Sequence, residues 1–469
     1  MSSNLLSITN NSSGRVSNTI PKPTSLAIDS TTRWLKRGIW AYFFLVIFEG
    51  ALRKWFVPAL ATPLLIVRDP IALWLIVVAW NRRLLPSTPY LIGMTLIAVI
   101  GIFTATLLGH GNLLVALFGA RPMLLHFPLI FVMGCLFTRE DVIAMGQATL
   151  WISLPMVVLI AFQFYSPQSA WVNQGVGGDT SGAGFSGAMG YFRPPGTFSF
   201  TNGTSSFFSF VAPFVFYFWL NKKLINKFLL IAATVALLFS IPLSISRGLF
   251  FQVAISFLFV LVASARKPEY LGRMVLGVIG GFLVLTLLSG TETFGTAMAA
   301  FTDRFENANE SEGGLVEGVF LDRYLGGFLG SLLGSASVPF FGFGLGMGTN
   351  VGAMLLTGSR TFLIAEGEWG RIIGELGPIM GLSVVFIRVA LTAKIFMACY
   401  RKLAQADLLP WMLLSYGLIT LSQGGWGQPT SLGFFTLIGG LILASLRRPG
   451  ILSNKVNHIS THASQLHNN

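Results

Sequence analysis

The stretch 366–377 places acidic and basic residues at the start of an apolar run, where they could move a proton or bind an anion. Glu368, Arg371 and Glu375 follow at intervals of three and four residues, so a helix would place them on one face, able to pair with each other. Glu366 lies off that face. Two interpretations stay open. In the first, the acidic residues are there because the positive end of a helix dipole favours them. In the second, Glu366 is a base that takes a proton from a hydroxyl, with Glu368 as the less favoured candidate.

Three arginines stand beside a proline or in a tight turn, with no acidic residue near them in the sequence: Arg121, Arg193 and Arg247. An arginine inside a bilayer costs at least about 2.5–3.5 kcal/mol, so such residues are functional-site candidates. We predict that the three converge on one anion; the alternative is that each extends separately to the membrane interface. Because a guanidinium stays charged when desolvated and grips phosphate through two hydrogen bonds, arginine favours a phosphate-bearing ligand.

Two further charged pairs lie in apolar runs near the N-terminus. Glu49 and Arg53 have the four-residue spacing of a helical ion pair. Arg68 and Asp69 precede Pro70, which predicts a broken helix whose adjacent charges compensate each other. Either pair could be structural or functional.

The elements that position these residues are transmembrane helices. The 469 residues are 53% hydrophobic and only 10% charged, with a mean hydropathy of +0.70, which excludes an ordinary soluble domain. We predict an all-α polytopic membrane protein in which apolar runs form about twelve spans: 38–56, 61–80, 89–108, 114–136, 142–165, 199–220, 226–245, 248–265, 273–290, 372–397, 408–424 and 430–446.

The distribution of lysine predicts the orientation. Most lysines fall in the connections on one side, which the positive-inside rule makes cytoplasmic, whereas Lys54 is the one lysine expected outside. An even number of spans puts both ends on that side, as cytoplasmic tails at 1–32 and 449–469 around a single transmembrane domain at 33–448. The net charge of +13 is therefore mostly an orientation signal, and it does not predict nucleic-acid binding.

Two long connections face outward in this topology, at about 166–198 and 291–371. The first is rich in glycine, and the second, which precedes the tenth span, contains Arg323 and Arg360 among more numerous acids. The second also has glycines at 342, 344, 346 and 348, an alternation that resembles a nucleotide-binding fingerprint. Because no βαβ unit surrounds it, we predict close backbone packing or a re-entrant turn instead.

In this order and topology the chain resembles the O-antigen ligase and Wzy-type polysaccharide polymerase superfamily, over roughly residues 110–445. The similarity lies in "GARPMLLHFPLIF", "RPPGTFSFTN", "SISRG", the long outer loop and "AEGEWGRIIGELGPIMG". In ligases the last motif resembles a histidine followed by an aromatic residue, a glutamate and a glycine. Here Trp369, Glu375 and Gly377 match, but Glu366 stands at the histidine position. This departure favours the polymerase branch.

The resemblance implies a metal-independent, inverting glycosyltransferase, without a cofactor, at the periplasmic face of a bacterial inner membrane. Its partners would be an undecaprenyl-pyrophosphate-linked glycan donor, a glycan acceptor, the lipid bilayer and, as a further candidate, a chain-length regulator. The candidate catalytic residues are Glu366 and Glu368. The candidate substrate contacts are Arg121, Arg193, Arg247, Arg323, Arg360 and Arg371. The alternatives are a ligase that moves finished glycan, a flippase or exporter of the lipid-linked sugar, and a small-solute transporter.

Overall fold

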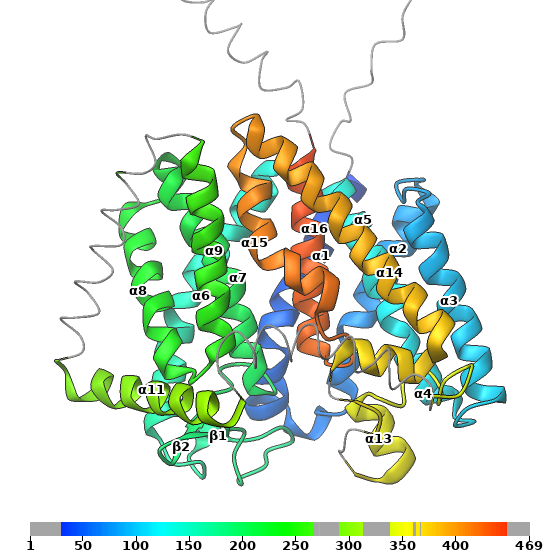
Figure 1. Cartoon of the computed structure of the whole chain (residues 1–469), viewed down its shortest axis with the longest axis horizontal. Helices are drawn as coiled ribbons and strands as arrows, with labels where there is room; N and C mark the ends of the chain where they lie inside the picture. Colours follow the sequence, from blue (N-terminus) through cyan, green and yellow to red (C-terminus); the bar gives the residue numbers. More distant parts are fainter. Residues whose placement is uncertain are drawn as a thin grey trace, which may run out of the picture.

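A computed structural model describes residues 30–266, 272, 290–312, 338–359, 363–365 and 367–447, and this part of the chain is mostly helical (Figure 1). Its α-helices are α1 (Ser30–Ala51), α2 (Arg68–Asn81), α3 (Pro89–Leu107), α4 (Leu113–Arg121), α5 (Phe127–Leu136), α6 (Arg139–Tyr165), α7 (Thr201–Leu220), α8 (Lys227–Leu243), α9 (Arg247–Ala265), α11 (Glu292–Glu312), α13 (Asn350–Thr357), α14 (Glu368–Ala404), α15 (Leu408–Gln423) and α16 (Pro429–Leu446). The strands β1 (Phe185–Ala188) and β2 (Tyr191–Arg193) form one antiparallel hairpin. Short helical turns include η1 (Leu52–Phe56) and η4 (Pro122–His126).

The helices confirm a polytopic membrane protein. Eight helical segments of the described chain are long and apolar enough to cross a membrane, and α8 and α15 are shorter apolar helices. Each predicted span overlaps a described helix except 273–290, which lies, apart from its last residue, outside the described residues. The number twelve therefore stays a prediction. Helix α1 begins at Ser30, so the last three residues of the predicted tail at 1–32 are helical.

The two long connections carry small elements at one end of the bundle, which we call the hairpin end because β1 and β2 lie there with α11 and α13 (Figure 1). Helix α11 lies across the ends of the neighbouring helices. Its Phe294 ring packs 5.1 Å from that of Phe239 in α8, and its Phe301 ring lies 6.1 Å from that of Phe250 in α9. The apolar face of α11 thus covers the ends of α8 and α9.

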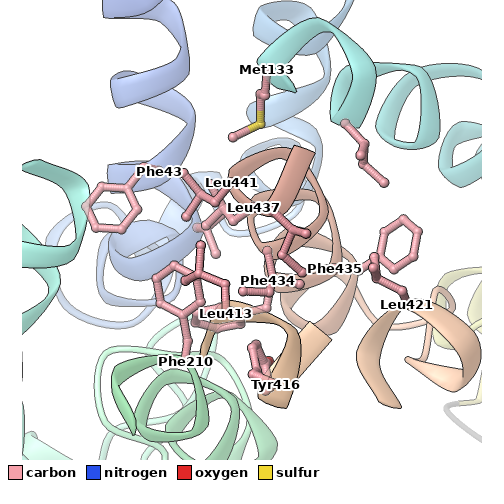
Figure 2. Packing of buried hydrophobic residues seen from close by; sticks show 14 of the residues in the cluster. Phe43, Met133, Phe210, Leu413, Tyr416, Leu421, Phe434, Phe435, Leu437 and Leu441 are labelled. Carbon is pink, nitrogen blue, oxygen red and sulfur yellow. The ribbon is translucent and has the colours of Figure 1, made fainter. Parts of the chain in front are cut away.

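Helix α16 lies in the middle of the apolar core, as Figure 2 shows for its side chains Phe434, Leu437 and Leu441. A Cβ atom added to Gly439 or Gly440 would lie 3.0 Å from Ile130 or 2.6 Å from Met133, respectively. These glycines therefore allow α16 and α5 to pack closely, as small residues do between membrane helices.

The last residues of α1 and the turn η1 that follows it contact the segment 193–199, which has the sequence "RPPGTFS". Lys54 Nζ donates to the carbonyl oxygen of Gly196 at 2.6 Å, and Arg53 Nη1 donates to Ser199 Oγ at 3.0 Å. A Cβ atom on Gly50 would lie 2.5 Å from the backbone of Phe198, so the two segments touch through their main chains. Arg53 and Lys54 thus hold this segment in position.

Helix α14 bends sharply at Gly377, which has φ 79° and ψ 170°, a conformation open almost only to glycine. Pro378 follows and has no N–H for the carbonyl of Gly374. That carbonyl instead accepts a hydrogen bond from Phe343 N at 2.8 Å, and the carbonyl of Glu375 accepts one from Gly344 N at 3.1 Å. The segment 338–349 therefore satisfies the backbone groups that the bend leaves open, as membrane-buried main chain requires.

The alternating glycines 342–348 make close backbone contacts, which confirms the packing interpretation of this run. A Cβ atom on Gly342 would lie 2.4 Å from the carbonyl oxygen of Glu375 in α14. One on Gly346 would lie 2.2 Å from the carbonyl oxygen of Val115 in α4. The segment is thus wedged between α4 and α14 and links the two helices.

Replacing Gly377 by alanine is expected to destabilise the protein. The backbone conformation alone costs a residue with a Cβ atom on the order of 1–3 kcal/mol, and the added atom would lie 2.0 Å from the carbonyl oxygen of Phe340. Thermal unfolding of the purified protein measures the loss. Gly367→Ala is the matched control, since no atom lies within 4 Å of its added Cβ. Equal unfolding temperatures for the two variants would contradict the role of the bend.

Candidate functional site

The first two turns of α14 carry a buried cluster of charges. Arg371 donates to Glu368 twice, from Nε to Oε2 at 3.0 Å and from Nη2 to Oε1 at 2.9 Å. Its Nη1 donates to Glu375 Oε2 at 2.7 Å. The predicted pairing of these three residues on one helix face is therefore confirmed. Glu375 Oε1 also accepts a hydrogen bond from Gly348 N at 2.9 Å, which ties the glycine segment to the cluster.

Arg388, in the second limb of α14, completes the cluster. Its Nη1 lies 3.2 Å from Glu368 Oε1, although twenty residues of straight helix would span about 30 Å. The bend at Gly377 folds the two limbs together and makes this contact. This ion pair was not predicted from the sequence. The Gly-Pro dipeptide inside an apolar helix, with charged residues before and after it, was the feature that could have indicated a bend.

The cluster is neutral as a whole, because the two carboxylates of Glu368 and Glu375 face the two guanidinium groups of Arg371 and Arg388. All four side chains are at most 8% exposed. Burying ions is tolerable when they are paired and hydrogen-bonded, and removing one partner leaves an uncompensated charge. Arg371 thus pairs with both glutamates and also lines the neighbouring cavity, and its role as a substrate contact stays a prediction.

A cavity of about 250 Å³ adjoins the cluster. Glu368, Arg371 and Ala365 form its wall on the α14 side. The rest of the lining comes from the glycine segment, α13, the connection between α15 and α16, and the first turn of α16. These residues are Gly348, Asn350, Gln423, Gly425, Gly427, Gln428 and Ser431. The cavity is predominantly polar, unlike the surrounding core.

Three helices begin beside the cavity, and their N-termini carry partial positive charge. Asn350 starts α13, Glu368 starts α14, and Gln428 precedes the first residue of α16. Neither Gly367 nor Gln428 caps its helix with a side-chain hydrogen bond. Helix α13 has a cap, because Thr349 Oγ1 accepts a hydrogen bond from Gly352 N at 2.9 Å. Helix N-termini without a side-chain cap, as in α14 and α16, favour anions.

Two arginines hold the connection between α15 and α16. We call this connection and the helix residues that flank it the strap (residues 423–431). Arg388 Nη2 donates to the carbonyl oxygen of Gly424 at 2.7 Å, and its Nε donates to that of Leu421 at 3.2 Å. Arg68 Nη2 donates to the carbonyl oxygen of Pro429 at 2.8 Å. Hydrogen bonds from these two arginines thus hold the strap near both of its ends, and with it the part of the cavity wall that it forms.

A second cluster of charged side chains joins α1, η1 and α2. Glu49 Oε2 lies 3.0 Å from Arg68 Nε, and Glu49 Oε1 lies 3.3 Å from Arg53 Nη1. The predicted helical pair of Glu49 and Arg53 is confirmed. The predicted compensation between Arg68 and Asp69 is wrong in its partners, because the two side chains pair with other helices: Arg68 with Glu49, and Asp69 with Arg121.

Arg121 has an acidic partner that its sequence neighbourhood does not show. Its Nη1 lies 2.7 Å from Asp69 Oδ2, and the other oxygen of Asp69 lies 3.2 Å from His126 Nε2. The opposite ring nitrogen of His126 is 2.8 Å from the Tyr42 hydroxyl. A network of four side chains therefore connects α1, α2, α4 and η4. Arg121 is part of this network and does not line the cavity.

The other predicted residues fall into two groups. Arg193 ends β2 and Arg247 begins α9; neither lines the cavity, and in Figure 1 both elements lie on the opposite side of the bundle from α4 and α13. The predicted convergence of these two arginines with Arg121 is therefore not seen around this cavity. The remaining candidates lie outside the described residues: Arg323, Arg360 and Glu366.

The fold and the cluster define a helical membrane protein with a polar, charge-lined cavity near its hairpin end. Among the described residues, no group of three or more histidine, cysteine or acidic side chains is placed to hold a metal ion. Comparison with protein-family models gives no match, and comparison with curated protein sequences gives no significant match.

Proposed function

We propose that the protein is a glycosyltransferase that polymerises undecaprenyl-pyrophosphate-linked oligosaccharide repeats at the periplasmic face of a bacterial inner membrane. One observation carries the proposal: the Glu368 carboxylate borders a polar cavity inside a membrane protein, at a point where three helix N-termini meet. A carboxylate suits proton abstraction from a hydroxyl, and helix N-termini suit a phosphate group.

Glu368 keeps room for one more hydrogen bond. Its Oε1 accepts from Arg371 and Arg388, and its Oε2 accepts from Arg371. A carboxylate offers about four lone-pair sites, so one site on Oε2 is open to a substrate hydroxyl. The two arginines fix the orientation of the carboxylate. Glu366, two residues before α14, is the alternative base.

The proposed step is a single displacement. The acceptor hydroxyl gives its proton to the carboxylate, and its oxygen forms a bond to the anomeric carbon of the donor sugar. The bond from that carbon to the phosphate oxygen breaks on the opposite face, and its electron pair leaves with undecaprenyl pyrophosphate. The helix N-termini beside the cavity stabilise the charge that builds on the departing group.

Purified protein in lipid vesicles, incubated with undecaprenyl-pyrophosphate-linked repeats, tests this proposal. A polymerase gives a ladder of products that grow by one repeat at a time, whereas a ligase gives a single transfer to a separate acceptor. A flippase or exporter moves the lipid-linked repeat between leaflets without forming a glycosidic bond. A vesicle assay that shows movement of the lipid-linked repeat but no new glycosidic bond would contradict the proposed function.

A further inference from the structure

The cavity has two walls of different chemistry. Glu368 and Arg371 make a charged wall on the α14 side, where the two side chains satisfy each other. The facing residues are uncharged and polar, and we call them the amide wall: Asn350, Gln423, Gln428 and Ser431. Asn350 begins α13, whereas Gln423, Gln428 and Ser431 all lie in the strap, so the fold brings together segments that are far apart in the sequence.

Asn202, in the first turn of α7, supports the amide wall from behind. Its Nδ2 donates to Gln428 Oε1 and lies 3.4 Å from Ser431 Oγ. Because this bond directs the carbonyl oxygen of Gln428 toward Asn202, the amide nitrogen with its two N–H donors points away from Asn202 and can meet a ligand. Asn202 Oδ1 is buried, and in the described part of the chain it has no hydrogen-bond partner. Buried polar atoms of this kind call for a partner.

The hydrogen-bonding pattern indicates what the amide wall recognises. A primary amide offers both donors and acceptors, and so does a sugar hydroxyl, whereas an ionised phosphate offers acceptors only. A phosphate would leave the amide oxygens of Asn350 and Gln423 without donors. A hydroxylated ring can satisfy both halves of each amide. At about 250 Å³ the cavity is smaller than the roughly 300–1,000 Å³ of drug-sized sites, which fits one sugar ring and not a whole repeat.

We infer that the amide wall is the subsite for a single sugar ring, and that Gln428 and Gln423 are specificity-determining residues that read its hydroxyl groups. The choice of a sugar as ligand rests on the proposed function. The subsite orients one hydroxyl toward Glu368 on the charged wall, and the pyrophosphate of the donor lies outside the amide wall. Arg68 and Arg388 fix the strap that carries both glutamines.

Saturation-transfer NMR on the full-length protein in nanodiscs tests this inference without requiring turnover. The probes are free hexoses, N-acetylhexosamines, deoxyhexoses and uronic acids, each alone, and inorganic pyrophosphate as a competitor. Gln428→Leu and Gln423→Leu each remove one amide from the wall. Gln428 gives α16 no side-chain cap, but it accepts a hydrogen bond from Asn202, so thermal unfolding of each variant checks that the fold is kept. Gln405→Leu, an exposed site at the far end of α14, is the matched control.

The expected result is that the wild type binds at least one of these sugars and that pyrophosphate does not displace it. Each wall variant should bind roughly two- to tenfold more weakly, the loss that one hydrogen bond accounts for, while Gln405→Leu binds as the wild type does. No binding of any sugar, or binding unchanged in both wall variants, would overturn the inference. Sugar binding that depends on the wall, in a protein that forms no glycosidic bond, would uphold the subsite and refute the transferase.

Discussion

Glu368→Gln is expected to lower the rate of glycan transfer by at least roughly 10²-fold, because general-base catalysis contributes on this order or more. Glutamine has nearly the shape of glutamate and can still accept hydrogen bonds, but it cannot hold the proton of the attacking hydroxyl. Arg371 and Arg388 also lose their shared ionised partner. The measurement is the initial rate of product formation in vesicles, corrected for the folded fraction of each protein.

Glu375→Gln separates catalysis from charge pairing. Glu375 is buried, lies on the same helix and pairs with the same Arg371, but it does not line the 250 Å³ cavity. We expect this variant to unfold at a lower temperature and yet to retain transfer within about tenfold. If both variants lose activity equally, Glu368 acts through the ion pairs alone. If Glu366→Gln loses the activity that Glu368→Gln keeps, the base is Glu366.

Arg388→Met is expected to cost about 3–5 kcal/mol of stability, the range found when one partner of a buried ion pair is removed. The change leaves Glu368 with one guanidinium and removes the donor of the Leu421 and Gly424 carbonyls. The strap would then lose one of its two fixed points, so sugar binding should weaken as well. Chemical or thermal unfolding and the sugar-binding assay measure the two effects.

Arg388→Lys should recover only part of the loss, because a single ammonium group cannot reach Glu368 and both carbonyls with the geometry of a guanidinium. Arg266→Met is the control, since this exposed arginine stacks 4.6 Å from the Tyr400 ring at the other end of the bundle. Its effect should stay within about 0.5 kcal/mol. An Arg388→Met protein as stable as the wild type would contradict the clamping role.

The helices themselves were predictable from the sequence, because apolar runs of membrane length leave few other structures open to them. The grouping of Glu368, Arg371 and Glu375 was predictable too, since spacing along one helix face decides it. The alternating glycines were correctly assigned to backbone packing, although the partners in α4 and α14 could not be named.

Contacts between distant segments were not predictable. Asp69 and Arg121 lie 52 positions apart, and no local pattern reports that α2 and α4 bring them together. Arg388 reaches Glu368 only because the chain bends at Gly377. The strap carries no charge and so offered no signal of chemistry, yet it forms much of the cavity wall. The arginines that sequence reasoning grouped together prove to be distributed over the bundle.

The central claim is that the cavity between Glu368 and the amide wall is the place of glycan transfer. Cryo-electron microscopy of the full-length protein in nanodiscs with an undecaprenyl-pyrophosphate-linked repeat tests it most directly. The account predicts density for a sugar ring between Glu368 and Gln428, with the pyrophosphate next to the cavity and outside the amide wall. Density for the pyrophosphate between Arg193 and Arg247, with the cavity unchanged, would contradict it.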